Sequence, residues 1–304
     1  MQDSITRTEP LTAAPHASAK KTMPRVDYLN PPGAPALYSP DSLAWQVFKN
    51  PVALFVGGIT AVLLELAEPR VRTGVWGHSI FPTDPLTRIK RTGAVTHATV
   101  YAPVESATRI IQMVNRMHER VEGRTPAGHP FRANDLVLLN WVQATVGYGF
   151  MEAYAAFVRP FSDAERDRFY VESQPVAQLF GATGAPRSLV EQRAQFEEMR
   201  PHLEDHVIVH DFLAIMKKVP ALPLFMRPLQ PVMVRAGVSL LPSWLRERLN
   251  LGAEWQLKPR EEKLLRWLGA KFDRLTIPGA PPAQACQRLG LPRNYLYQPS
   301  ARTR

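Results

Sequence analysis

A chain of 304 residues with 45% hydrophobic and 21% charged residues has the composition of a globular protein that buries a substantial core. Its single cysteine, Cys286, excludes an internal disulfide and any metal site built from several cysteines. Residues 217–304 hold 16 Lys and Arg against 5 Asp and Glu, and the rest of the chain holds 21 against 22, so the C-terminal part carries the whole net charge of +10.

The basic C-terminal part combines its charge with apolar, Trp-bearing stretches around residues 222–228 and 240–246. This combination suits contact with an anionic membrane surface, or a lid over an apolar substrate. An ordinary solvated basic face explains the charge equally well. We expect no nucleic-acid partner, because the aromatic residues are not interleaved with a basic repeat.

The first 38 residues are rich in Pro, Ala, Ser and Thr, which predicts a disordered N-terminal tail. No charged-then-apolar leader precedes the domain, and we expect a cytoplasmic protein with peripheral membrane contact. From residue 39 to residue 290, helix start signals are frequent and strand-like alternation is scarce, which predicts one all-α domain. Residues 291–304 form a basic C-terminal tail.

The longest apolar run, Val52–Leu64, is too short to span a bilayer and predicts a buried core helix. Gly57 and Gly58 lie in its middle, where each costs about 1 kcal/mol of helix stability relative to alanine. Something must therefore pack close to the backbone there. Either a flat cofactor or a neighbouring helix meets that requirement.

A second helix begins at Asp84, a good N-cap followed by Pro85 in the first turn. Arg88, Arg91 and Thr92 follow at spacings that place them on one face. Two guanidiniums and a hydroxyl suit an anion or a polar reactive ligand such as oxygen. A solvated basic face is the alternative.

The next helix, residues 103–123, is predicted to start at Pro103 and to stop at Gly123. Its apolar stripe contains one residue of another kind, His118; the other members are Val104, Ala107, Ile111, Val114 and Val121. A histidine that faces a core must satisfy two ring nitrogens. Polar neighbours can do this, and so can a bound metal.

Three further histidines, His202, His206 and His210, are spaced four apart and are expected on one helix face. Two histidines at this spacing can bind zinc, but the glutamate of the zinc-protease pattern is missing, and so are the repeated Glu-x-x-His motifs of di-iron sites. We therefore expect a surface or supporting role for them. Serine-nucleophile and phosphate-loop motifs are absent from the sequence.

Several short segments, taken in order, resemble the MpaB-type oxygenases, which include the rubber oxygenases called latex-clearing proteins. The resemblance covers roughly residues 45 to 270 and is carried by His78–Pro85, Arg88-x-x-Arg91-Thr92, Met117–Gly123, Phe131–Asp135, Leu139–Val142, Pro160–Arg166 and Pro186–Ser188. No single segment is decisive. Their order and spacing make the match specific.

The resemblance implies an all-helical domain with haem b, an iron cofactor, between core helices. In the rubber oxygenases a histidine holds the iron from the proximal side, and the matching residue here is His118. An Arg-x-x-Lys-Thr face lies on the distal side and matches Arg88, Arg91 and Thr92. At the position of the family lysine this sequence has Arg91. An arginine stays charged and cannot act as a metal ligand or base, although it still donates hydrogen bonds.

Two further residue roles follow from the same resemblance. His78 matches the family pattern and is expected either to contact a haem propionate or to cap a turn. Rubber oxygenases also use an acidic residue as a base, and the sequence alone does not identify it. Asp84 has a capping role that explains it without chemistry, whereas Glu65 and Glu68 lie near the apolar helix.

The sequence thus predicts a haem b-dependent oxygenase that acts with dioxygen on an apolar substrate, such as an isoprenoid or lipid-like alkene. One alternative is a non-catalytic haem- or lipid-binding helical protein associated peripherally with membranes. Another is a helical scaffold without a metal whose basic C-terminal part binds membranes.

Overall fold

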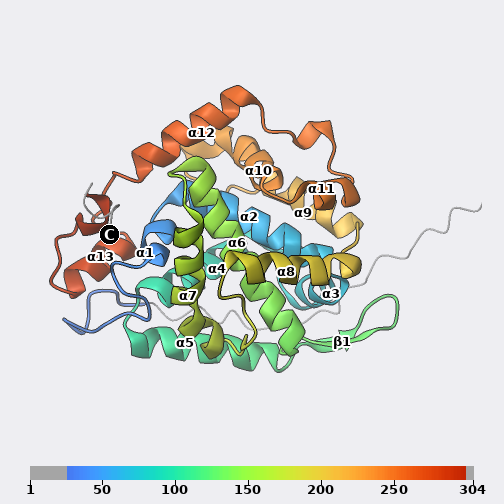
Figure 1. Ribbon diagram of the computed structural model, residues 1–304, viewed down its shortest axis with the longest axis horizontal. Helices are drawn as coiled ribbons and strands as arrows, with labels where there is room; N and C mark the ends of the chain where they lie inside the picture. Colours follow the sequence, from blue (N-terminus) through green and yellow to red (C-terminus); the bar gives the residue numbers. More distant parts are fainter. Residues whose placement is uncertain (1–25, 299–304) are drawn as a thin grey trace, which may run out of the picture.

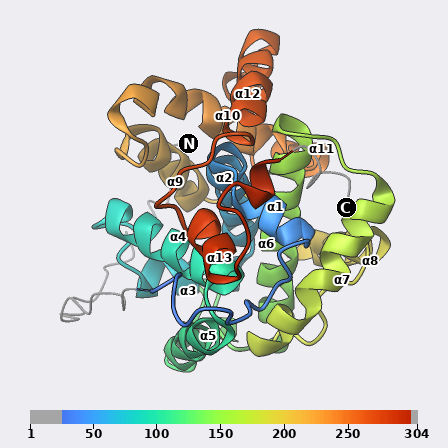
Figure 2. The same ribbon diagram turned by 90° about the vertical axis from the view of Figure 1, so that its left-hand side faces the viewer.

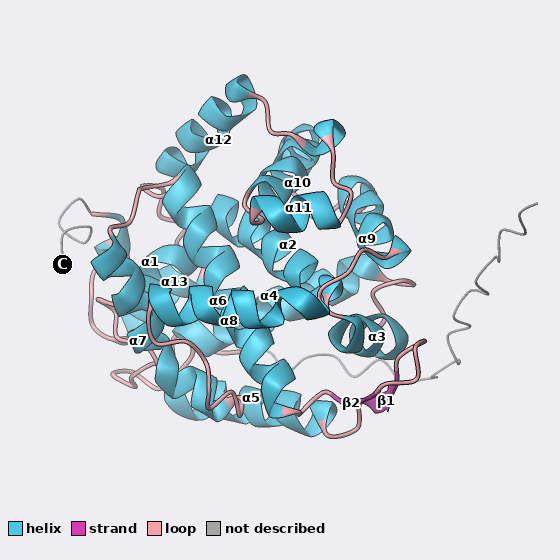
Figure 3. Cartoon of the chain, turned by 45° about the vertical axis from the view of Figure 1, so that its right-hand side comes forward, coloured by secondary structure: helices cyan, strands magenta, loops and turns pink. Residues whose placement is uncertain are grey.

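The computed structural model describes residues 26–298, and this part of the chain is almost entirely helical (Figures 1 and 3). It contains thirteen α-helices and four short 3-10 helices within residues 26–298. The strands described there form one antiparallel hairpin, β1 (Glu122–Arg124) with β2 (Pro130–Arg132). The predicted all-α fold class is therefore confirmed.

Two long apolar helices, α2 (Pro51–Ala67) and α6 (Leu136–Phe157), cross at the centre of the molecule. A Cβ added to Gly149 would lie 2.5 Å from the Gly57 carbonyl oxygen, and one on Gly57 would lie 2.7 Å from that of Gly149. The two glycines thus let the helix backbones touch. Of the two explanations that the sequence left open, a neighbouring helix accounts for Gly57.

The remaining helices surround this pair. Viewed as in Figure 2, α5 lies at the bottom, α12 at the top, α7 and α8 on the right, and α9 and α10 at the upper left. The bounds are α1 Leu43–Phe48, α3 Pro69–His78, α4 Pro85–Tyr101, α5 Val104–His118, α7 Asp163–Leu179, α8 Leu189–Met199, α9 Val207–Lys218, α10 Gln230–Ser239, α11 Ser243–Arg248, α12 Pro259–Phe272 and α13 Pro281–Arg288; the 3-10 helices are η1 Arg200–His202, η2 Leu224–Leu229, η3 Ala253–Trp255 and η4 Tyr295–Tyr297.

Side-chain caps fix several of the helix starts. The Asn50 side chain accepts hydrogen bonds from two backbone N–H groups at the start of α2, and the Asp84 carboxylate accepts one from Thr87 at the start of α4. Ser162 and Glu165 form the reciprocal capping box that their spacing predicts at the start of α7.

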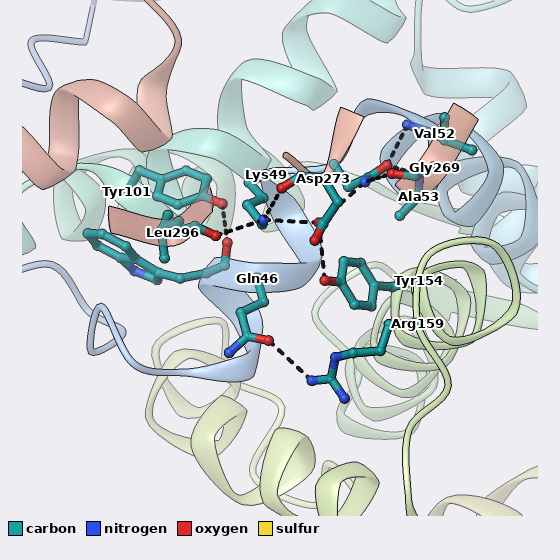
Figure 4. A network of polar contacts seen from close by, with 12 residues as sticks. Gln46, Lys49, Val52, Ala53, Tyr101, Tyr154, Arg159, Gly269, Asp273 and Leu296 are labelled. Atoms are coloured by element: carbon teal, nitrogen blue, oxygen red, sulfur yellow. Dashed lines mark hydrogen bonds and ion pairs between the residues drawn. The ribbon is translucent and has the colours of Figure 1, made fainter. Parts of the chain in front are cut away.

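A buried polar network ties the start of the domain to its end (Figure 4). The Lys49 ammonium lies 3.0 Å from an Asp273 carboxylate oxygen and donates to the Leu296 carbonyl at 2.8 Å. The Tyr154 hydroxyl donates to the same Asp273 carboxylate at 3.1 Å. The junction of α1 and α2 is thereby joined to the end of α12 and to η4.

Both predicted tails include residues that the structure describes. Within the N-terminal tail, the Tyr28 and Ala34 carbonyls accept hydrogen bonds from Arg288 of α13 at 2.9 and 2.8 Å. Within the C-terminal tail, Leu296 and Tyr297 are buried. These segments pack on the helical domain, while residues 1–25 and 299–304 of the tails lie outside the described residues.

The helix α2, which covers the longest apolar run, is a core helix, with one face and most of its length buried. Within residues 26–298, no single helix has the length and hydropathy of a membrane-spanning segment. The pair α2 and α3, bent by 110°, reaches them only when the two helices are taken together.

Candidate active site

His118 is the last residue of α5 and is partly buried. Its Nδ1 atom is shielded from solvent and has no hydrogen-bond partner in the described part of the chain. A buried ring nitrogen without a partner is costly in a folded protein. His118 is therefore available for a ligand that the chain itself does not provide.

The predicted stripe of α5 is only partly confirmed. Ala107 and Ile111 are buried, but Val104 at the first turn is exposed. The helix also begins after Pro103, which is its N-cap, and ends at His118. Gly123, the predicted stop, instead lies in β1, because the β-hairpin pairs its backbone with residues near Phe131.

The predicted polar face of α4 forms as its spacing requires. Arg88 and Thr92 are hydrogen-bonded through Nη1 and Oγ1, and the Thr92 hydroxyl donates to the Arg88 carbonyl at 2.9 Å. Arg91 lies close enough to Arg88 to lower its pKa, an effect that adds to the larger one of burial. Arg88 and Arg91 are partly buried, whereas Thr92 is exposed.

Glu65 of α2 faces this polar pair. Burial raises the pKa of Glu65 to about 7, an effect that the Arg88 guanidinium and the Thr145 hydroxyl offset only in part. The Thr145 Oγ1 lies 3.4 Å from a Glu65 carboxylate oxygen. Glu65 is therefore a carboxyl group that gains and loses its proton near neutral pH.

The same guanidinium also acts on His118. The pKa of His118 is lowered, first by burial and second by the positive charge of Arg88. Both effects favour the neutral imidazole, which is the form that ligates a metal. Glu65, Arg88 and His118 thus form one electrostatic cluster, contributed by α2, α4 and α5.

The face of α2 that carries Glu65 is the most open part of this helix. Gly58, Val62 and Glu65 follow one another at helical spacing, and all three are only partly buried. A Cβ on Gly58 would meet nothing closer than the Phe150 ring at 3.9 Å. The helices α4 and α5 pack on each other, whereas neither packs closely on α2.

His78 is the second cofactor residue that the sequence predicts. It is the last residue of α3 and is exposed, with its ring edge-on to Phe131 at 6.5 Å between centroids. No contact joins it to Arg88 or His118 in the described residues. Its proposed contact with a haem propionate stays a prediction.

The structure separates the three acidic residues that the sequence left as candidates. Glu68 caps α3 through a bond from the Val71 N–H at 2.8 Å and pairs with Arg70 at 2.6 Å. Asp84 caps α4. Only Glu65 faces Arg88, and its position in the last turns of an apolar, buried helix is the one sequence signal that could have singled it out.

The three histidines at four-residue spacing do not share a helix face, so that prediction is wrong. His202 ends η1, and the chain is extended until His206, whose Nδ1 accepts from the Ile208 N–H at 3.2 Å and caps α9. His210 pairs with Asp205 at 2.9 Å. Across residues 26–298, no group of three or more His, Cys, Asp or Glu side chains has the geometry to hold a metal ion.

Glu65, Arg88 and His118 and the helices that carry them lie within the part of the chain that matches a known family. The family model described as ER-bound oxygenase mpaB/B'/rubber oxygenase, catalytic domain, matches residues 45–274. The chain belongs to this family, as the sequence motifs predicted. Searches of curated proteins and of solved structures found no match.

Proposed function

We propose that the protein is a haem b-dependent oxygenase that uses dioxygen to oxidise an apolar substrate, such as an isoprenoid or lipid-like alkene. Membership of the oxygenase family supports the reaction class. The observation that supports haem is the unpartnered Nδ1 of His118, whose pKa is lowered by burial and by the Arg88 guanidinium.

The residues present fit a haem. His118 is held neutral, as an imidazole that ligates iron must be, and the partly buried face of α2 that carries Glu65 also includes the apolar residues Gly58 and Val62. Gly58 carries no side chain, and a Cβ there would lie 3.9 Å from the Phe150 ring. His118 would hold the iron, and Arg88, Arg91 and Thr92 of α4 would supply the polar groups for the reactants.

A bound haem supplies the iron that activates dioxygen toward an electron-rich double bond. Arg88 would orient the reactants by donating hydrogen bonds from its remaining guanidinium N–H groups, and Thr92 would hold the guanidinium in place by accepting from Nη1. Arg91 would contribute positive charge and hydrogen bonds but no proton transfer, because a guanidinium stays protonated. Glu65 would hold or accept a proton at its carboxyl oxygens, because its pKa of about 7 suits both states at neutral pH.

The test of the cofactor is the Soret absorbance of protein reconstituted with haemin. Wild-type protein should bind haemin with a Soret band, and His118→Ala should abolish that band. His129→Ala, which removes an exposed histidine of the β-hairpin turn, is the matched control and should keep it. Wild-type protein without a Soret band would refute haem binding, and an unchanged band in His118→Ala would reassign the ligand.

Oxygen consumption separates the oxygenase from the non-catalytic alternative. The reconstituted protein should consume oxygen in the presence of an apolar alkene such as squalene, and Glu65→Gln should slow this consumption without removing the Soret band. A haem-bound protein that consumes no oxygen with squalene or with polyisoprene would favour a non-catalytic haem-binding protein.

We also propose that the protein is cytoplasmic and contacts an anionic membrane surface through α12. Figure 1 shows α12 along the upper edge of the molecule. Leu264 and Trp267 are 38% and 57% exposed, and Arg260 and Lys271 lie on the same stripe of the helix. Exposed tryptophan and leucine flanked by basic residues are typical of helices that lie in a membrane interface.

Co-sedimentation with vesicles tests this contact. Wild-type protein should sediment with vesicles that contain phosphatidylserine and less with neutral vesicles, and the Leu264→Ser/Trp267→Ser variant should lose this binding. Val190→Ser, at a residue of α8 that is 73% exposed, is the matched control and should bind as the wild type does. Equal sedimentation of the double variant would refute the proposal.

A further inference from the structure

A cavity of about 450 Å³ opens on the C-terminal half of the molecule, apart from the Glu65–Arg88–His118 cluster. In Figure 1, α11 lies at the upper right, whereas α5 runs along the bottom. The cavity is lined by α10, α11, η3 and the turn between α11 and η3, through Val238, Ser243, Arg246, Glu247, Asn250, Leu251, Gly252, Ala253, Trp255 and Gln256.

Arg246 is the unusual residue of this lining. It is partly buried, its Nε is shielded from solvent without a hydrogen-bond partner, and no carboxylate in residues 26–298 lies within ion-pair distance of it. Nearby arginines differ: Arg235 pairs with Glu261, and Arg248 donates to the Leu203 carbonyl at 3.2 Å. The Arg246 Nε is thus a buried donor without an acceptor in residues 26–298, which points to a partner from outside the chain.

The backbone fixes the place of Arg246. At the end of α11 the Leu251 N–H donates to the Arg246 carbonyl at 3.0 Å, and the Asn250 N–H donates to the Glu247 carbonyl at 3.1 Å. Asn250 has the left-handed φ of 50° that this helix ending requires. Its side chain also donates to Asp205 at 2.7 Å. The guanidinium is thus carried by a helix end with little freedom to rearrange.

The rest of the cavity lining combines polar and apolar residues, and a second cation contacts one of its aromatic rings. Val238, Leu251 and Trp255 are buried, and the Lys217 ammonium lies 3.7 Å from the centroid of the Trp255 ring. Glu247 also borders the cavity and is exposed. The Glu247 carboxylate at the border of the cavity, which does not pair with Arg246, disfavours a polyanion, so the site suits a single negative charge on an apolar body.

We propose that this cavity binds a small organic carboxylate with an apolar chain, such as a medium-chain fatty acid. Arg246 would pair with the carboxylate through two parallel hydrogen bonds, and the chain would lie on Val238, Leu251 and Trp255. The volume of about 450 Å³ is within the range of small-molecule sites, roughly 300–1,000 Å³. The proposal does not depend on haem or on oxygenase activity.

Isothermal titration calorimetry with decanoate, below the concentration at which it forms micelles, tests the proposal. Decanoate should bind one site on the full-length protein, and 1-decanol and inorganic phosphate should bind much more weakly. Arg246→Met should weaken decanoate binding by about tenfold or more, because it removes a charged hydrogen-bonding partner. Arg246→Lys keeps the charge but not the paired geometry and should weaken binding less.

Arg193→Met, at an exposed arginine of α8, is the matched control and should leave decanoate binding unchanged. Circular dichroism should show that Arg246→Met is folded and no less stable than the wild type, since it removes an unpaired charge. Equal binding of decanoate and 1-decanol would overturn the role of the carboxylate. Absence of decanoate binding to the wild type would overturn the site. So would an affinity for decanoate in both Arg246 variants that equals the affinity of the wild type.

Discussion

Glu65 gives the structure its most specific pH dependence, and replacing it with glutamine tests it. Burial raises the pKa of this carboxyl from 4.5 to about 7 in the folded chain. A group whose pKa is higher in the folded chain than in the unfolded one stabilises the fold fully below the unfolded pKa. That contribution is lost as the pH rises through the folded value. The wild type should therefore lose stability between about pH 5 and pH 8 through this residue.

The size of the effect follows from the two pKa values. At 1.36 kcal/mol per pKa unit, a shift from 4.5 to about 7 would change the free energy of unfolding by at most about 2.5 kcal/mol between pH 5 and pH 8. Because the carboxyl is partly open to solvent, we expect about 1–2 kcal/mol. Glu65→Gln mimics the protonated carboxyl at every pH. The free energy of unfolding of this variant, measured relative to the wild type, should therefore rise by about 1–2 kcal/mol from pH 5 to pH 8.

Urea unfolding of haem-free protein at pH 5, 6, 7 and 8 measures the difference. Glu165→Gln is the control: burial alone would raise the pKa of Glu165, but the Ser162 N–H and Arg159 hold it below its usual range. Its contribution to stability changes only below about pH 4.5, so the difference between this variant and the wild type should stay flat. If the Glu65→Gln difference is also flat, Glu65 does not titrate near pH 7 and the proposed proton-transfer role is refuted.

Three further predictions concern packing and buried groups. Gly149→Ala would place its Cβ against the α2 backbone and should lower the free energy of unfolding in urea by about 2 kcal/mol or more. Gly58→Ala meets no close atom and should raise this free energy by up to about 1 kcal/mol. Similar values for both variants would contradict the helix crossing. Lys49→Met leaves the buried Asp273 carboxylate without its cation and should cost about 3–5 kcal/mol in the same assay; a loss under about 1 kcal/mol would show that the pair is not buried. Burial raises the pKa of Cys286 to about 11, so native protein should not react with a thiol reagent at pH 8 until it is unfolded; rapid reaction would contradict this burial.

Much of the fold could be predicted because its signals are local. The caps at Asp84 and Ser162 act within one helical turn, and the spacing of Arg88 and Thr92 places them on one face whatever surrounds the helix. The length of the apolar run predicted the core helix α2. These features need no knowledge of the tertiary structure.

The site could be predicted only in part, because its chemistry comes from contacts between helices. The pKa of Glu65 depends on α4 and α6, which bring Arg88 and Thr145 beside it. The wrong prediction for the three histidines has the same origin. Between His202 and His206 tertiary contacts replace helical ones. The Glu204 carboxylate pairs with Arg72, and the Glu204 N–H donates to the Ala67 carbonyl.

The Lys49 network has a consequence for where the protein ends as a folding unit. The family match stops at residue 274, yet the lysine is held by Asp273 on one side of that boundary and by the Leu296 carbonyl on the other. In a chain that ends at residue 274, the buried Lys49 ammonium would lose its hydrogen bond to the Leu296 carbonyl, and η4 would no longer cover it. The part of the chain that matches the family is therefore shorter than the part that packs as one body, and residues 275–298 belong to the second alone.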